Sequence, residues 1–469
     1  MGNKKNLLRL ILLAVVAVVC GVLAVGKLGV KDGATFTLSL LLTISILSVG
    51  KNDIKKAVYL FIVSMPILVT ARKGFYLDFL IFKLNFETLI ILGLFIVNYR
   101  NIALNFRERF ENRENRKFIN LILLFVFTSL ISSIFSHNIL DSLRLTITSV
   151  LIPVLLGVIV LANFSKEDMK NLVYALAISI NLSCLYGGVQ ILGIGLSISK
   201  IKNSRELLTF GYHNVNIFVN IALMVFPLIL NELLYKKNNT KEKLFLIGSI
   251  FLQSICIFLT FSRGAWLALG MAVGLILFSK KYKKIFIAIT ILGLISLPVV
   301  LPRILARGGS STHLLANTSN TARLLSIVTS KEIMKDNLLG VGFGNFNKYY
   351  RESAEKAYLT LDYGLRKHML APLYTMEHAH NIFLNIGVEL GILSLIFILA
   401  IFFQRLKTSI KNYSFYRGIF ISLIIFIFIG LTTGIELNHK GVISNTYILW
   451  MLFSMLSMKS SQKVNEWLC

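Results

Sequence analysis

Long runs of apolar residues recur along nearly the whole chain, and they restrict the folds that it can adopt. The chain has 469 residues, of which 55% are hydrophobic and 15% are charged, and its mean hydropathy is +0.74. An apolar run of roughly 20 residues is long enough, as a helix, to cross a bilayer. Because a backbone in lipid must satisfy its own hydrogen bonds, such runs form helices. We therefore expect an all-α polytopic membrane protein.

The apolar runs predict about 12–14 transmembrane helices. An apolar run that ends at Gly26 follows Lys4, Lys5 and Arg9, and this order is typical of an uncleaved signal-anchor helix. The fourteen candidate spans are 7–26, 34–50, 57–71, 86–99, 118–136, 145–163, 171–192, 214–235, 244–261, 264–279, 285–301, 382–403, 416–433 and 442–458.

The distribution of Lys and Arg predicts which segments face the cytoplasm. With the N-terminus inside, the inner segments hold 28 of the 49 cations and the short outer segments hold 11, the other 10 lying in one long loop. Short cytoplasmic loops are enriched in Lys and Arg, whereas long segments cross largely regardless of charge. We therefore expect both termini in the cytoplasm and the long loop outside.

The net charge of +27 does not indicate a nucleic-acid-binding protein. The positive residues lie in short loops between apolar runs, where they fix membrane topology, and no separate basic domain exists. We expect the bilayer as the surroundings of this chain and no nucleic-acid partner.

The long outer loop divides the chain into four regions. We expect N-terminal transmembrane helices over 1–200, further transmembrane helices with arginine motifs over 201–301, the outward loop over 302–381, and C-terminal transmembrane helices over 382–469. The loop ends in the sequence Glu-His-Ala-His-Asn and leads directly into an apolar run.

Two histidines, His378 and His380, stand at the membrane end of this loop. A His-x-His pair supplies too few ligands for zinc, and no third ligand has suitable spacing, so we expect no metal. A histidine with an ordinary pKa can accept a proton from a sugar hydroxyl at neutral pH, which favours a general base. The alternative is a pair of surface histidines at the start of a helix.

Two arginines are also placed on the outer side by the charge count. Arg263 lies in a Ser-Arg-Gly turn with apolar residues on both sides, so it is either a side chain that extends to the headgroups or a binding group for an anion. Arg205 precedes the stretch from Phe210 to Asn216, which is an ordinary outer loop when taken alone. Two guanidiniums could bind a diphosphate through charge-assisted hydrogen bonds.

Other polar residues near the histidines have less specific patterns. Arg323 lies in an amphipathic stretch, Thr321 to Lys335, that we expect along the membrane interface. The glycine run from Gly340 to Gly344 lacks the Lys-Ser/Thr ending of a phosphate-binding loop, which favours a tight turn. Glu389 lies four residues after Asn385 inside an apolar run, so we expect its carboxylate to face protein and to hold a helix or a histidine.

These motifs together resemble the O-antigen ligase and O-antigen polymerase family of bacterial membrane glycosyltransferases. The turn at Arg263 resembles the family's arginine motif, and Arg205 with Gly211 and Asn216 is similar to its upstream arginine region. Residues 340–346 resemble its glycine segment. His380 and Asn381, followed by Gly391, match its histidine signature, except that Ser394 stands where Gly, Thr or Tyr is usual.

The resemblance implies a GT-C-like helical fold that uses neither metal nor cofactor and a donor glycan on undecaprenyl diphosphate. It implies that Arg205 and Arg263 bind the diphosphate, and that His380 is the base of an inverting transfer to an acceptor hydroxyl. His378 is then a second catalytic candidate, and the supporting residues are Arg323, Asn381, Glu389 and Gly391.

Several functions remain open at this point. A ligase moves the glycan to a lipid A-core sugar or an equivalent acceptor, whereas a polymerase joins two lipid-linked repeat units, and both share these motifs. We favour a ligase, because the loop lies late in the chain and ends in His-Asn; a relative that glycosylates proteins is a further alternative. A lipid-glycan transporter is less favoured, since no inverted repeat is present. The sequence does not predict the oligomeric state.

Overall fold

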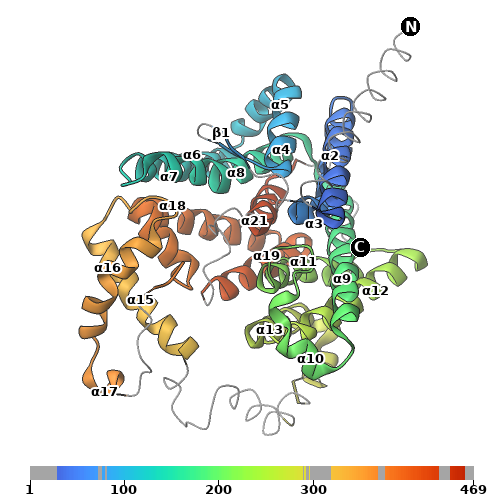
Figure 1. The fold of residues 1–469 in the computed structure, drawn as a ribbon. Coiled ribbons are helices and arrows are strands. Elements are labelled where there is room, and N and C mark those ends of the chain that lie inside the picture. The colour runs from blue at the N-terminus through green and yellow to red at the C-terminus, as the bar shows by residue number, and fades with distance from the viewer. Residues whose placement is uncertain are drawn as a thin grey trace.

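The computed structural model describes residues 29–71, 77–79, 82–288, 290–291, 295, 318–367, 375–431 and 444–459. These residues form an assembly of helices with one short hairpin, in which β1 (Leu77–Phe79) pairs with β2 (Phe82–Leu84) in antiparallel register. Figure 1 shows the hairpin at one edge of a helical molecule. The prediction of an all-α polytopic membrane protein is confirmed.

The helices fall into three groups along the chain (Figure 1). The first group contains α2 (Val30–Gly50), α3 (Ile54–Thr70), α4 (Phe86–Val97), α5 (Tyr99–Glu111), α6 (Arg113–Ile134), α7 (Ile139–Thr146) and α8 (Ile152–Asn163). The second contains α9 (Met169–Ile194), α10 (Ile198–Asn203), α11 (Val215–Tyr235), α12 (Thr240–Leu259) and α13 (Arg263–Leu277). The third contains α15 (Thr318–Asp336), α16 (Phe346–Leu359), α17 (Tyr363–Arg366), α18 (Ile382–Lys411), α19 (Tyr413–Gly430) and α21 (Ser444–Met455).

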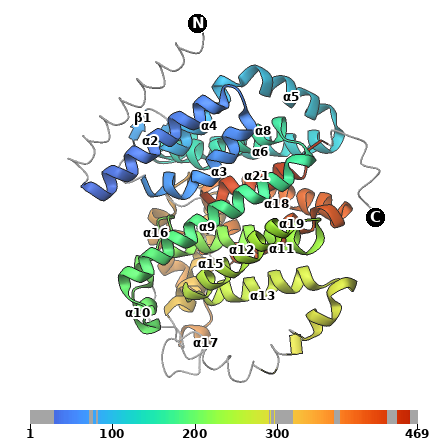
Figure 2. The same ribbon diagram turned by 90° about the vertical axis from the view of Figure 1, so that its right-hand side faces the viewer.

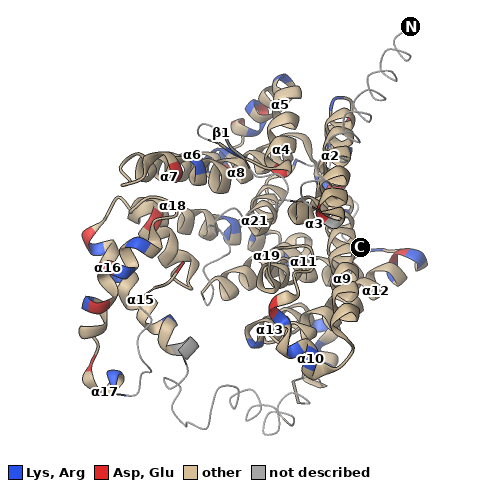
Figure 3. Cartoon of the chain, viewed as in Figure 1, with Lys and Arg blue, Asp and Glu red and all other residues tan. Residues whose placement is uncertain are grey.

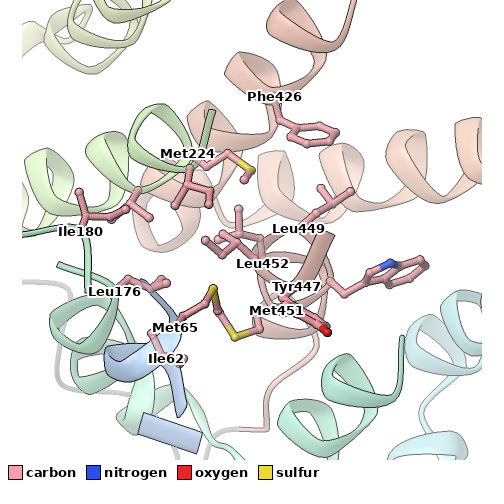
Figure 4. Packing of buried hydrophobic residues seen from close by; sticks show 14 of the residues in the cluster. Ile62, Met65, Leu176, Ile180, Met224, Phe426, Tyr447, Leu449, Met451 and Leu452 are labelled. Carbon is pink, nitrogen blue, oxygen red and sulfur yellow. The ribbon is translucent and has the colours of Figure 1, made fainter. Parts of the chain in front are cut away.

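Helix α21 lies in the centre of the bundle and is buried along its whole length. All twelve of its residues are buried, among them Leu449, Trp450 and Leu452. Figure 4 shows this helix surrounded by side chains from α3, α9, α11 and α19, including Met65 and Met224. A helix that is apolar on every side is suited to the interior of a bundle rather than to its edge. Segments far apart in sequence therefore share one apolar core.

The described residues contain fewer spanning helices than the apolar runs predict. Eight helices are long and apolar enough to cross a membrane, or up to ten if two bent pairs each count as one span. The bends follow α4, at 80°, and α13, at 105°. Helix α3, with 17 residues, and the described part of α21, with 12 residues, are shorter than these spans. Candidate span 7–26 and most of 285–301 lie outside the described residues.

Charged residues are concentrated at the ends of the bundle and in α15 to α17. Figure 3 shows Lys and Arg on α5, on the start of α12 and on α10, whereas the central helices are largely uncharged. In the view of Figure 2, α5 and α10 lie at opposite ends of the molecule. This separation is what a bilayer requires, because charges are costly in its apolar centre.

The position of Leu452 in this core gives a test of the packing. The Leu452 side chain is 0% exposed, whereas Leu123 on α6 is 60% exposed. Leu452→Ala should destabilise the folded protein by about 2–5 kcal/mol, because it leaves a cavity that the neighbours cannot close. Leu123→Ala removes the same atoms from the surface and should change stability by less than about 1 kcal/mol. Thermal unfolding of both variants in one detergent measures the difference, and equal effects would contradict the central position of α21.

Candidate active site

Contacts between helix ends place Arg205, Arg263 and His380 at the same end of the bundle. At the last turn of α11, the Tyr235 hydroxyl lies 2.8 Å from the carbonyl oxygen of Ile276, which is near the end of α13. Helices α11 and α13 pack against one another and end together, with α12 between them in sequence, so both begin toward the same end of the bundle. Arg263 opens α13, and the Arg205 loop leads into α11, so both lie at the beginning of these two helices.

The chain reaches the same end again at the histidines. Helix α19 starts beside the end of α11, where the Arg417 guanidinium lies 3.6 Å from the Tyr235 ring centroid, so α19 runs antiparallel to α11. The far end of α19 therefore lies near the start of α11. There the Asn381 side-chain amide donates to the carbonyl of Leu431, at 3.4 Å. We call this end of the bundle the histidine end.

The Arg205 loop is held against the bundle by its own polar residues. Arg205 donates to the side-chain oxygen of Asn216, at 2.8 Å. Asn214 caps α11 by accepting from the backbone N–H groups of Asn216 and Ile217. Gln190 on α9 accepts from the backbone N–H of Phe210, at 3.0 Å. The grouping of Arg205 with Asn216, predicted from sequence, is thus a direct contact in the structure.

Arg263 begins α13 directly after a tight turn. Phe261 has a positive φ of 51°. Helix α13 starts two residues later, and Ser262 is its N-cap residue. Arg263 is half-buried, and it makes polar interactions within the protein. The turn therefore places a cationic residue in the first turn of α13, at the histidine end.

The two histidines are in contact with one another. Their ring centroids are 4.4 Å apart, and the rings are inclined at 64°. His380 has a positive φ of 51°, which is uncommon outside glycine and signals a backbone constrained by its surroundings. Both side chains are half-buried, immediately before Asn381 caps the start of α18.

His380 lies in an environment that opposes its protonation. Burial, and to a smaller extent the positive charge of Arg323, lowers the pKa of His380 from 6.5 to about 4. His380 is therefore neutral at pH 7, and one ring nitrogen of a neutral imidazole carries a lone pair that can accept a proton. Because the pKa is lowered on folding, this group favours the folded state above pH 6.5, and the contribution is lost as the pH falls toward 4.

Arg323 lies on α15 and supplies the cation next to His380. Its side chain keeps exposed surface, yet the surrounding protein removes enough water for burial to lower its pKa. The stretch that contains Arg323 was predicted to lie along the membrane interface. In the structure it forms α15, which packs on α16 and α18 through a small apolar cluster that includes Leu325, Ile333 and Tyr350.

A chain of hydrogen bonds connects the histidine backbone to the buried carboxylate of Glu389. The backbone N–H of Ala379, between the two histidines, donates to the side-chain oxygen of Asn385, at 2.8 Å. The Asn385 amide donates to Glu389, at 3.2 Å. The other Glu389 oxygen accepts from the backbone N–H groups of Gly344, at 3.0 Å, and Phe346, at 3.2 Å. Glu389 thus faces protein, as predicted. It connects residues 340–346, which we call the glycine segment, to the backbone between the two histidines.

Helix α18 is broken at Gly391, and the glycine segment fills the break. Gly391 has φ 85° and ψ 167°, so the helix cannot continue through it. The carbonyls of Val388 and Glu389 accept instead from the backbone N–H groups of Val341 and Gly342, each at 2.9 Å. A Cβ on Gly340 would lie 2.5 Å from the Gly391 nitrogen. The tight turn predicted for this glycine run is therefore a backbone-to-backbone contact in which only glycine fits.

Sequence reasoning did not identify the residues that anchor the glycine segment. The Asn345 side-chain nitrogen lies 2.8 Å from the hydroxyl of Ser136 and 3.0 Å from that of Ser142. The Ser132 hydroxyl donates to the Glu389 carbonyl, at 2.7 Å. The sequence signal for this contact is the set of four serines in the apolar run from Ser129 to Ser136. Buried hydroxyls in such a run need hydrogen-bond partners from another segment.

The site consists of the half-buried side chains of the two histidines, Arg205 and Arg263, together with the more exposed Arg323. Among the described residues, no group of three or more His, Cys, Asp and Glu side chains is arranged to hold a metal ion. Two arginine turns, a neutral histidine and a third arginine lie at one end of a helical bundle. These features define a multi-pass membrane protein with a candidate site at one end of its helical bundle.

Comparison with known families agrees with the resemblance seen in the motifs. Residues 248–399, about a third of the chain, match the model of the family described as O-antigen ligase. This match supports an assignment of the matched region to the O-antigen ligase and polymerase family, and with it a ligase-like or polymerase-like function. The matched region contains Arg263, Arg323 and His380, whereas Arg205 lies before it. No curated protein matches the chain.

Gly187 gives a test of how the Arg205 loop is positioned. A Cβ on Gly187 would lie 1.9 Å from the ring of Phe210, which is stacked on Phe218, whereas a Cβ on Gly188 would meet no atom within 4 Å. Gly187→Ala should therefore displace Phe210 and the loop, and Gly188→Ala should not. We expect limited proteolysis of the loop to be accelerated several-fold in the first variant alone. Equal rates in the two variants would contradict the packing of Phe210.

The electrostatic effect of Arg323 on His380 can be measured directly. Arg323→Gln removes the cation, so the pKa of His380 should rise above 4 but remain below 6.5, because burial is the larger cause. NMR titration of ¹³C-labelled histidine, with His380→Gln to assign the signal, measures the change. Lys348→Gln, on the exposed face of α16, removes a charge elsewhere in the loop and should leave the pKa unchanged. A fall in the pKa of His380 in Arg323→Gln would contradict the assignment.

Proposed function

We propose that this protein transfers a glycan from undecaprenyl diphosphate to an acceptor hydroxyl on the outer face of the bacterial cytoplasmic membrane. The observation that carries the proposal is that Arg205, Arg263 and the His380–Arg323 pair all lie at one end of the bundle, the histidine end. The family match supports the reaction class. The acceptor that we favour is a lipid A-core sugar or its equivalent, which makes the protein a ligase.

Arg205 and Arg263 would bind the diphosphate of the donor. The outer face of the membrane lacks nucleotides, so a donor there must carry its own leaving group, and a lipid diphosphate does so. A guanidinium forms charge-assisted hydrogen bonds of about 1.5–3 kcal/mol with such an anion. These bonds strengthen as negative charge develops on the leaving diphosphate, so they favour the transition state over the bound substrate.

His380 would take the proton from the acceptor hydroxyl. The hydroxyl oxygen then forms a bond to the anomeric carbon of the donor sugar while the bond from that carbon to the diphosphate breaks, with inversion. His380 is neutral and able to accept a proton at neutral pH, although a pKa of about 4 makes it a weak base. An anionic diphosphate close to Arg323 would offset the charge of that arginine and raise the basicity of His380.

Glu389 and Asn385 would act as positioning residues. They hold the backbone of Ala379 between the two histidines through the hydrogen bonds described above. Asn381 fixes the start of α18, because its side chain accepts from the N–H groups of Phe383 and Leu384. Gly391 permits the break in α18 that lets the glycine segment approach. His378, in contact with His380, would assist in orienting the ring of the base.

Activity of site variants tests this assignment. His380→Ala should lower transfer by about two to four powers of ten, because it removes the base. Arg263→Ala should lower kcat/KM by about 10- to 100-fold through lost bonds to the diphosphate. His137 is exposed in the turn after α6, so His137→Ala should leave the rate unchanged. The assay uses purified protein in liposomes with undecaprenyl-diphosphate-linked repeat units, and near-normal rates in both site variants would refute the site.

The same assay separates the three functions. With and without a lipid A-core acceptor, a single shifted product that requires the acceptor identifies a ligase. A ladder of products formed without the acceptor identifies a polymerase. Movement of the donor across the membrane without any product, with the cognate glycan present, identifies a transporter and would refute the proposal.

A further inference from the structure

Basic and aromatic side chains from several elements gather at the end of the bundle opposite the histidine end. We call this group the basic–aromatic cluster. It lies where α11 ends and α19 begins, next to the short turns η3 (Lys166–Asp168) and η5 (Lys280–Tyr282). Its members are the cations Lys166, Lys236, Lys281 and Arg417 and the rings of Tyr235, Tyr282, Tyr413 and Phe415.

Arg417 occupies the centre of the cluster and is stacked on aromatic rings. Its guanidinium carbon lies 3.6 Å from the centroid of the Tyr235 ring and 5.1 Å from that of Tyr413. A guanidinium stacked on a ring keeps its N–H groups directed outward in its own plane, where they can bind an anion. The Nη1 atom of Arg417 is buried, and it has no hydrogen-bond partner in the described part of the chain. A buried, charged donor in this condition indicates a missing acceptor.

Two lysines of the cluster lie near the same aromatic ring, that of Phe415. The Lys236 ammonium lies 4.6 Å from the Phe415 centroid, and the Lys166 ammonium lies 5.7 Å from it. Burial lowers the pKa of Lys236; Glu232 raises it in part, and the like charge of Arg417 lowers it further. Lys166, Lys236 and Arg417, from three different elements, therefore lie near one another, around Phe415 and Tyr235, in spite of their mutual repulsion.

The anionic side chains nearby only partly compensate these charges. Glu232 is the carboxylate that acts on Lys236, and it is buried near the end of α11. Glu242 is held by Lys170, at 2.8 Å. Lys281 is used differently from the other three cations, because its ammonium donates to the carbonyl of Leu234, at 3.2 Å. Arg417, Lys236 and Lys166 are thus the cations left to bind a ligand.

We propose that the basic–aromatic cluster binds the phosphate group of an anionic phospholipid. A phosphate supplies acceptor oxygens to a guanidinium and to two ammoniums at once. The surrounding tyrosines are typical of the membrane–water boundary, where a lipid headgroup lies. Basic sites between transmembrane helices at this boundary commonly bind anionic headgroups. If the histidine end faces outward as proposed above, this lipid belongs to the inner leaflet, but the binding site itself does not depend on the transfer reaction.

Lipid retention by the purified full-length protein tests this proposal. The protein is placed in nanodiscs with equal amounts of phosphatidylglycerol and phosphatidylcholine, and the lipids that remain bound are measured by native mass spectrometry. Arg417→Gln combined with Lys236→Gln should lower the preference for phosphatidylglycerol by about tenfold or more, since two charge-assisted contacts are lost. Lys166→Gln with Lys236→Gln provides a second variant that leaves the stacked Arg417 in place.

The matched control is Lys237→Gln combined with Lys241→Gln. These lysines are exposed at the same end of the bundle, outside the cluster, and the change in net charge is equal. The control should keep the preference within about twofold. An equal loss in the cluster and control variants, or no preference in the unaltered protein, would overturn the proposal.

A further arm distinguishes the source of the phosphate group. Inorganic phosphate at millimolar concentration is added to the unaltered protein in nanodiscs. Unchanged retention of phosphatidylglycerol supports a lipid headgroup, whereas its displacement by phosphate overturns the lipid and assigns the cluster to a soluble phosphate. Normal glycan transfer by the cluster variants would separate this site from the one at the histidine end.

Discussion

The contact between the glycine segment and the break in α18 is the constraint on which the candidate site depends. A helix crossing a membrane normally satisfies its own backbone groups, and a break leaves several of them without partners. Here the carbonyls of Val388 and Glu389 are satisfied by the glycine segment, and the Glu389 carboxylate accepts from the same segment. One junction therefore attaches α15 and α16 to the bundle and fixes the residues that precede α18. The position of the histidines follows from this attachment.

The junction also explains the electrostatic state of His380. Because α15 is packed against the first part of α18, Arg323 is held close enough to affect the histidine, and partial burial lowers the pKa of both groups. A histidine in free solution would be partly protonated near pH 6.5, whereas this one is neutral. If the proposed function is right, the negative charge of the bound donor offsets the charge of Arg323 and raises the pKa of His380. The environment, more than the histidine itself, thus sets when the base is strong.

Some parts of the site were predictable from sequence, because they depend on local chemistry. Asn214 and Asn381 each stand before an apolar run and cap a helix, as asparagine commonly does. The contact between Arg205 and Asn216 joins two residues that are near in sequence, because the Arg205 loop leads directly into the first turn of α11, where Asn216 lies. The contact of Asn345 with Ser136 and Ser142 was not predictable, since about two hundred residues separate the partners. In the sequence, Arg417 cannot be distinguished from other cations near the ends of apolar runs. Its stacking on Tyr235 depends on the packing of α19 against α11.

The sequence by itself determined the class of the protein, the approximate place of most of the spanning helices and the motifs of the family. Hydropathy is a local property, and the bilayer imposes one kind of element on every long apolar run. The tertiary structure decided which helix ends meet, where α4 and α13 are followed by sharp bends, and that a break in α18 receives the glycine segment. These features depend on packing between segments that are distant in sequence, and a linear pattern contains no information on which partner a buried polar group finds.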